Sequence, residues 1–120
     1  MRETEYSARE MGVIVARGDA VVGRLWIRAR WAGVTLSADS EGLVLQAPLF
    51  GEVTLLPEQV VSLAVRVKWW RLTRAIVIRH NSRTAPPVVH FCSSEAPQEI
   101  IWRIDAAGFH PRGSDDEWTR

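Results

Sequence analysis

A single segment near the end of the chain, residues 95–107, predicts a helix. It constrains the fold because residues 12–92 predict short strands, and a curled sheet of such strands needs an element that covers its open side. Its start carries Ser94 as a candidate N-cap, acidic residues in the first turn, and Pro97 where a missing N–H does no harm. Four apolar residues recur at helical spacing along one side: Ile100, Ile101, Ile104 and Ala107. Gly108 stands where a left-handed residue ends a helix, and Phe109 follows as the apolar residue that packs back on the last turn. We expect this helix to lie on a sheet through its apolar stripe.

Residues 12–92 predict about seven short strands. Apolar or alternating segments recur at spacings of roughly 8–12 residues, and clusters of turn-forming residues separate them. The clearest breaks are Asp39–Gly42, Pro48–Gly51 and Asn81–Pro87. Strands at this spacing, followed by one helix, predict a mainly β fold. We expect a small antiparallel barrel or sandwich that the C-terminal helix caps.

The first third of the chain predicts strands that are separated by two turns. Gly12–Ala16 predicts a first strand or an arm, which pairs either within its own sheet or with a neighbouring chain. Arg17–Asp19 and Ala32–Gly33 have turn chemistry. Between them Val21–Trp31 alternates, which predicts one half-buried strand. Period two puts Leu25, Ile27, Ala29 and Trp31 on one face and Arg24, Trp26, Arg28 and Arg30 on the other.

The chain has 120 residues, which is enough for one domain with its own core. We place that domain at residues 12–109, between a polar tail, 1–11, and an acidic tail, 110–120, both expected to be flexible. Cys92 is the only cysteine, which excludes an intramolecular disulfide and favours a reducing compartment. The sequence shows neither a signal peptide nor an apolar run long enough for a transmembrane segment. We therefore expect a cytoplasmic protein.

Three stretches carry a recognisable order of strands and breaks. They are the Leu-Phe-Gly-Glu-Val-Thr-Leu-Leu-Pro-Glu-Gln-Val-Val-Ser-Leu run at 49–63, the Ile-Val-Ile-Arg-His-Asn strand at 76–81 and the Val-Val-His-Phe-Cys-Ser-Ser-Glu join at 88–95. With the terminal helix, they resemble the pleckstrin-homology-like (PH-like) superfamily, in its bacterial PH-like and GRAM-like branch. The resemblance covers residues 18–109. It implies a helix that caps one open end of a barrel, and a binding module for lipid head groups or protein partners.

The charges are distributed unevenly, although the formal net charge is only +1. Residues 17–83 carry ten basic and five acidic side chains, whereas 95–120 carry three basic and six acidic ones. No acidic residue lies between Glu58 and Glu95, a stretch that holds Arg66, Lys68, Arg71, Arg74, Arg79 and Arg83. A basic surface of this kind favours an anionic partner.

Two sets of basic and aromatic residues are candidates for binding that partner. The first set surrounds a predicted hairpin tip at 68–74: Arg66, Lys68, Trp69, Trp70, Arg71 and Arg74. The second set is the charged face of the alternating strand: Arg24, Trp26, Arg28 and Arg30. Tryptophan beside arginine suits an anionic membrane surface, and it also suits single-stranded nucleic acid. The competing interpretation is that the tryptophans pack in the core or on a dimer mate while the arginines are solvated.

One group of residues could carry chemistry. Cys92 and His90 share a strand face, and His80 is predicted on the neighbouring strand, so the three could supply a nucleophile and base or metal ligands. Neither an orienting carboxylate nor a clear further ligand accompanies them. A lone cysteine more often serves as a small apolar residue. No known catalytic or nucleotide-binding motif is present, so we expect no enzyme, cofactor or metal site.

The first hypothesis is therefore a non-catalytic PH-like interaction module. Its partner would be another protein, a second copy of the chain through an exposed strand edge, or an anionic lipid surface. A homodimer is plausible because six tryptophans are many to bury in one small core. The alternative is a nucleic-acid-binding small barrel of OB-like type, with nucleic acid the less favoured partner. A third hypothesis is a small hydrolase that uses Cys92.

Overall fold

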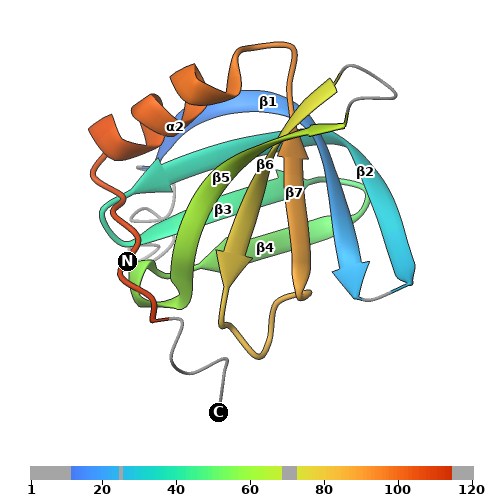
Figure 1. The fold of residues 1–120 in the computed structure, drawn as a ribbon, viewed down its shortest axis with the longest axis horizontal. Coiled ribbons are helices and arrows are strands. Elements are labelled where there is room, and N and C mark those ends of the chain that lie inside the picture. The colour runs from blue at the N-terminus through green and yellow to red at the C-terminus, as the bar shows by residue number, and fades with distance from the viewer. Residues whose placement is uncertain (1–11, 25, 69–72, 115–120) are drawn as a thin grey trace.

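The computed structural model describes residues 12–24, 26–68 and 73–114. Seven antiparallel strands form one sheet in the spatial order β4-β3-β2-β1-β7-β6-β5 (Figure 1). The strands are β1 Val13–Arg24, β2 Ile27–Asp39, β3 Gly42–Ala47, β4 Gly51–Leu55, β5 Val60–Lys68, β6 Thr73–His80 and β7 Val88–Cys92. A 3-10 turn at Pro57–Gln59 precedes β5, and one helix, α2, spans Pro97–Ala106. The prediction of a mainly β fold with about seven strands and one C-terminal helix is confirmed.

The sheet curls so that its two halves face each other. Figure 1 shows β5, β6 and β7 crossing in front of β3 and β4, with α2 at one end. Among the described residues β4 and β5 are the two edges of the sheet and do not pair with each other, so the sheet does not close into a barrel. The last strand, β7, lies between β1 and β6 and therefore joins the two halves.

The first strand is longer than the sequence indicates. The sequence left open whether this segment pairs within its own sheet or with a neighbouring chain. Residues 13–16 pair with β2 of the same chain, with Val13 opposite Ala38. The predicted turn at Arg17–Asp19 is wrong, because β1 runs through it with a shift of register between Gly18 and Ala20. A β-carbon on residue 18 would overlap the carbonyl oxygen of Cys92 on β7. Glycine is needed there because two backbones meet closely, not because the chain turns.

The first hairpin turn lies elsewhere than predicted. Val21–Trp31 is not one strand, since β1 ends at Arg24, β2 begins at Ile27, and these two residues pair. Ala32–Gly33, predicted as the turn, lies inside β2 opposite the register shift of β1. There the backbone of Gly33 has a φ of 70°. The turn-forming pair therefore makes a β-bulge, which uses the same left-handed glycine conformation as a turn.

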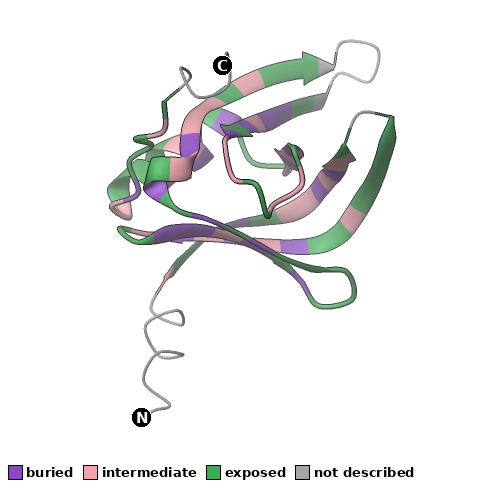
Figure 2. Cartoon of the chain, turned by 90° about the horizontal axis from the view of Figure 1, so that it is seen from below, coloured by how far each residue is buried: buried purple, intermediate pink, exposed green. Residues whose placement is uncertain are grey.

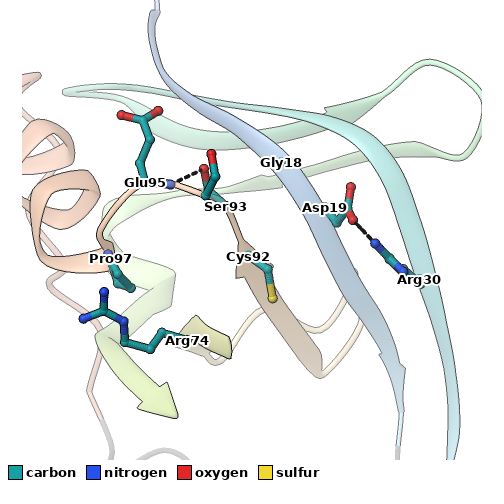
Figure 3. Close-up of a pocket in the computed structure, with 9 residues that line it drawn as sticks. Gly18, Asp19, Arg30, Arg74, Cys92, Ser93, Glu95 and Pro97 are labelled. Atoms are coloured by element: carbon teal, nitrogen blue, oxygen red, sulfur yellow. Dashed lines mark hydrogen bonds and ion pairs between the residues drawn. The ribbon is translucent and has the colours of Figure 1, made fainter. Parts of the chain in front are cut away.

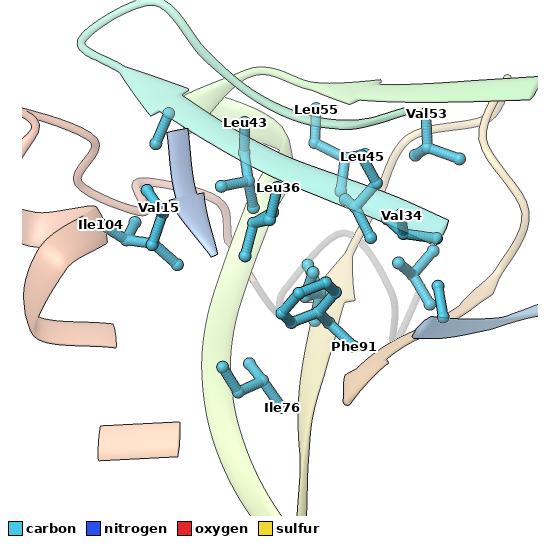
Figure 4. Packing of buried hydrophobic residues seen from close by; sticks show 14 of the residues in the cluster. Val15, Val34, Leu36, Leu43, Leu45, Val53, Leu55, Ile76, Phe91 and Ile104 are labelled. Carbon is cyan, nitrogen blue, oxygen red and sulfur yellow. The ribbon is translucent and has the colours of Figure 1, made fainter. Parts of the chain in front are cut away.

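The core lies between the two halves of the curled sheet. Leucine and valine side chains of β2, β3 and β4 point toward Ile76 and Phe91 from the other half (Figure 4). Figure 2 shows the alternation of buried and exposed residues along the strands, as expected for a sheet with one solvated face. His80 is the one polar side chain among the described residues that is buried with them.

Helix α2 closes the open end of this core. Ile100 and Ile104 are buried, and Ile101 packs against the same cluster, which confirms the predicted stripe. The predicted N-cap is wrong: Ala96 precedes the helix, without a side-chain cap, and Ser94 plays no such role. The predicted C-terminal closure is confirmed, because the N–H of Gly108 donates to Asp105 O at 2.9 Å and that of Phe109 to Ile104 O at 3.2 Å. With ten residues α2 is too short to span a bilayer, and no other helix in the described ranges could do so.

Beyond α2 the chain returns to the sheet. The N–H groups of Arg112 and Gly113 donate to the carbonyls of Pro57 and Val60, at 2.7 and 2.8 Å. The chain therefore stays on the body of the fold through Gly113. The sequence predicted flexible tails at 1–11 and 110–120, and of these tails residues 1–11 and 115–120 lie outside the described residues.

Candidate functional site

The β1–β2 hairpin ends in the most exposed large apolar side chain of the described residues. Trp26 is 92% exposed and the adjoining Ile27 is 81% exposed. Arg24 and Arg28, both exposed, flank this pair in sequence. We call these four residues the hairpin tip. They present a tryptophan and an isoleucine to solvent between two guanidinium groups.

The arginines of the hairpin do not share one face, as the sequence predicted. Arg24 pairs with Ile27, whereas Arg28 pairs with Gly23. Directly opposite residues on neighbouring strands point to the same side of a sheet. Arg24 therefore points to the side of Ile27, and Arg28 shares the opposite side with Arg30. The prediction of one face is wrong because the chain turns between Arg24 and Ile27, and this turn shifts the alternation by one residue.

A second exposed apolar group lies in the β3–β4 connection. Leu49 is 90% and Phe50 50% exposed, and the ring of Phe50 stacks on Trp31 of β2 with a centroid separation of 6.3 Å and an interplanar angle of 14°. Trp31 and Ile27 point to the same side of β2, because they are four residues apart on one strand. Figure 2 shows the two hairpin ends on one side of the molecule, with α2 at the other. The sequence indicates this exposed connection only by placing Leu49 and Phe50 between two turn-forming residues, a Pro and a Gly.

A pocket of about 420 Å³ lies where β7 leads into α2 (Figure 3). Its wall includes Asp19, Arg30, Arg74, Cys92 and Glu95. Arg30 and Arg74 come from the two basic sets that the sequence predicted separately, so the structure brings one member of each together. The sequence could not indicate this pocket, because it depends on β7 lying between β1 and β6.

Both acidic side chains in the pocket wall have basic partners. The Arg30 guanidinium bonds to the Asp19 carboxylate, with Nε at 3.1 Å from Oδ2. This hydrogen bond and the Asp19 charge raise the pKa of Arg30 above its ordinary value. Arg103 Nη1 lies 2.6 Å from Glu95 Oε1. Arg74 has no acidic partner among the described residues, so it is the one charged side chain of the pocket wall without an ion pair there.

The remaining members of the first basic set lie apart or outside the described residues. Arg66 is exposed on β5 and pairs with Ala75. Along the sheet, three strands lie between β5 and β2. Arg66 does not line the pocket that Arg30 and Arg74 share. Lys68 is the last residue of β5, and Trp69, Trp70 and Arg71 lie outside the described residues.

The residues predicted as a possible nucleophile, base or metal site do not form one constellation. Cys92 lines the pocket beside α2, whereas His80 and His90 line a different pocket of about 250 Å³. His80 accepts a hydrogen bond at Nδ1 from the Ser82 N–H, at 3.1 Å, and its Nε2 lies 2.7 Å from Pro86 O. His80 thus anchors the β6–β7 loop. No cluster of three or more metal-binding side chains occurs among the described residues.

Within the described ranges two surfaces are candidates for binding a partner: the hairpin tip, with apolar and basic side chains, and the pocket beside α2. Comparison with protein-family models, with curated proteins and with solved structures finds no match. The chemistry of these two surfaces supports the proposals that follow.

Proposed function

We propose that this chain is a non-catalytic PH-like binding module that docks on an anionic membrane surface through its hairpin tip. The observation that carries the proposal is the exposure of Trp26, 92%, and Ile27, 81%, between Arg24 and Arg28. An indole ring takes the boundary between head groups and acyl chains, an aliphatic side chain enters below it, and guanidinium groups meet anionic head groups.

The magnitudes indicate that the apolar residues dominate this binding. Burying an Ile-sized apolar side chain contributes about 1.5–3 kcal/mol. One arginine near an anionic surface contributes about 1 kcal/mol. Trp26 and Ile27 should therefore supply more of the affinity than Arg24 and Arg28, while the arginines restrict binding to anionic lipid.

The PH-like part of the proposal is supported by the order of the elements. A single antiparallel sheet of seven strands curls around one core, and one C-terminal helix covers its open end. This is the arrangement that the resemblance of residues 18–109 implies. The hairpin tip is at the end of the sheet away from that helix, so α2 does not obstruct it (Figure 1).

Trp26→Ala should reduce binding to vesicles that contain phosphatidylserine by about tenfold or more, because the ring is the largest apolar group that the tip can bury. Co-sedimentation measures this, with phosphatidylcholine vesicles as the neutral comparison and a series of salt concentrations. The wild-type chain should bind only the anionic vesicles, and less at high salt. Trp102→Ala is the matched control, because Trp102 is 64% exposed on α2, away from the tip. This variant should bind like the wild type.

Two results would reject membrane docking at the tip. One is equal binding to neutral and anionic vesicles. The other is a loss of binding in Trp102→Ala as large as that in Trp26→Ala. A chain that binds neither vesicle and has a dimer mass by light scattering would instead assign the exposed apolar residues to self-association.

A further inference from the structure

We propose that the pocket beside α2 is a second binding site, which takes a small organic monocarboxylate on Arg74. This site is separate from the hairpin tip and does not depend on membrane docking. It lies at the junction of β1, β6, β7 and the start of α2, and Figure 3 shows Cys92 between Arg74 and the Asp19–Arg30 pair.

The charges in the wall select an anion with a single negative charge. Asp19 is paired with Arg30, and Glu95 with Arg103. Arg103 also lies 3.8 Å from a Glu99 carboxylate oxygen and donates to the Val15 carbonyl at 3.0 Å. Arg74 is the one cation of the pocket wall that has no acidic partner among the described residues. A doubly charged phosphate would need a second cation and would lie close to two carboxylates. A monocarboxylate balances Arg74, and its two oxygens match the guanidinium fork.

The size and the polar groups of the pocket indicate the rest of the ligand. A volume of about 420 Å³ is within the range of sites for small molecules. With its carboxylate on Arg74, a ligand would extend past Cys92 toward the Asp19–Arg30 pair. That pair offers both acceptors and donors, so the far end of the ligand should carry a neutral polar group such as a hydroxyl.

The probe that fits this description is 4-hydroxybenzoate, and 4-hydroxybenzamide is its uncharged match. In an NMR titration of the labelled chain, the amides of Gly18, Ser93 and Glu95, which line the pocket, should shift and saturate with the benzoate. The benzamide should leave the signals of these three amides unshifted. Arg74→Gln should raise the Kd about tenfold or more, because it removes the charge-assisted pair. Arg79→Gln is the matched control on the same strand, because Arg79 lines the other pocket, and it should leave the Kd unchanged.

Asp19→Asn gives a second test, in the direction of tighter binding. It removes one negative charge from the wall and releases the Arg30 guanidinium, so the Kd for the benzoate should fall several-fold. An unchanged or higher Kd in this variant would overturn the placement of the ligand. Equal binding of the benzamide, an unchanged Kd in Arg74→Gln, or binding of inorganic phosphate as tight as that of the benzoate would also overturn the proposal. Trp26→Ala, which tests the hairpin tip, should leave all of these values unchanged.

Discussion

Phe91→Ala should lower the free energy of unfolding by about 3–5 kcal/mol, because it empties a position in the middle of the core. Phe91 is 1% exposed on β7 and pairs with Ala20 on one side and Ile76 on the other. The stability of a domain of this size is about 5–15 kcal/mol. The loss is therefore a large fraction of the total, and the Tm should fall by roughly 10–20 °C.

Urea denaturation followed by circular dichroism and tryptophan fluorescence measures this loss. The matched control is Phe50→Ala, which removes the same atoms from a residue that is 50% exposed. It should cost about 1 kcal/mol, mainly from the ring stack with Trp31. If the two variants lost equal stability, the packing of Phe91 between the halves of the sheet would not be the cause.

Gly18→Ala should cost about 2–4 kcal/mol, because the added β-carbon collides with backbone and not with a flexible side chain. The atom that it meets is the carbonyl oxygen of Cys92. A hydrogen bond from the Ser93 hydroxyl to the Arg17 carbonyl, 2.9 Å long, holds the two segments of the chain together beside this position. The backbones can separate only by breaking the β1–β7 pairing locally.

The same denaturation experiment with Gly42→Ala separates crowding from a general effect of replacing glycine. A β-carbon on residue 42 would lie 3.5 Å from the Leu55 carbonyl oxygen, an ordinary contact. Gly42→Ala should therefore stay within about 0.5 kcal/mol of the wild type. A small effect of Gly18→Ala, comparable to that of Gly42→Ala, would show that β1 and β7 are less closely apposed than the structure has them.

Local signals explain which elements could be predicted from the sequence. The C-terminal end of α2 was predictable because Gly108 and Phe109 bond to carbonyls only three to five residues earlier. The first hairpin was not, because Leu25 and Trp26 lack turn chemistry and continue the alternation of the strands around them. Ala32–Gly33 does have turn chemistry, and the structure uses it for a bulge. A glycine signal reports a backbone conformation, and only the pairing around it decides between turn and bulge.

The candidate sites depend on register over long distances in the sequence, which no local pattern contains. Trp26 and Arg28 could be selected from their composition, but their exposure at a tip follows from where β1 ends. Arg30 and Arg74 reach one pocket only because β7 separates β1 from β6 by a single strand. Periodicity predicts which face a side chain takes within its own strand, and it carries no information on which strands become neighbours.

The position of β7 also determines when the molecule can be completed during synthesis. β1 to β4 can pair in the order in which they are made, and β5 can pair with β6, but neither group contacts the other through the sheet until Val88–Cys92 is available. Pairing β1 with β7 closes a loop that contains most of the chain, and its entropic cost comes before the core contacts that offset it. On the ribosome the nascent chain therefore holds two incomplete layers with exposed inner faces until β7, the last of the described strands, emerges and unites them.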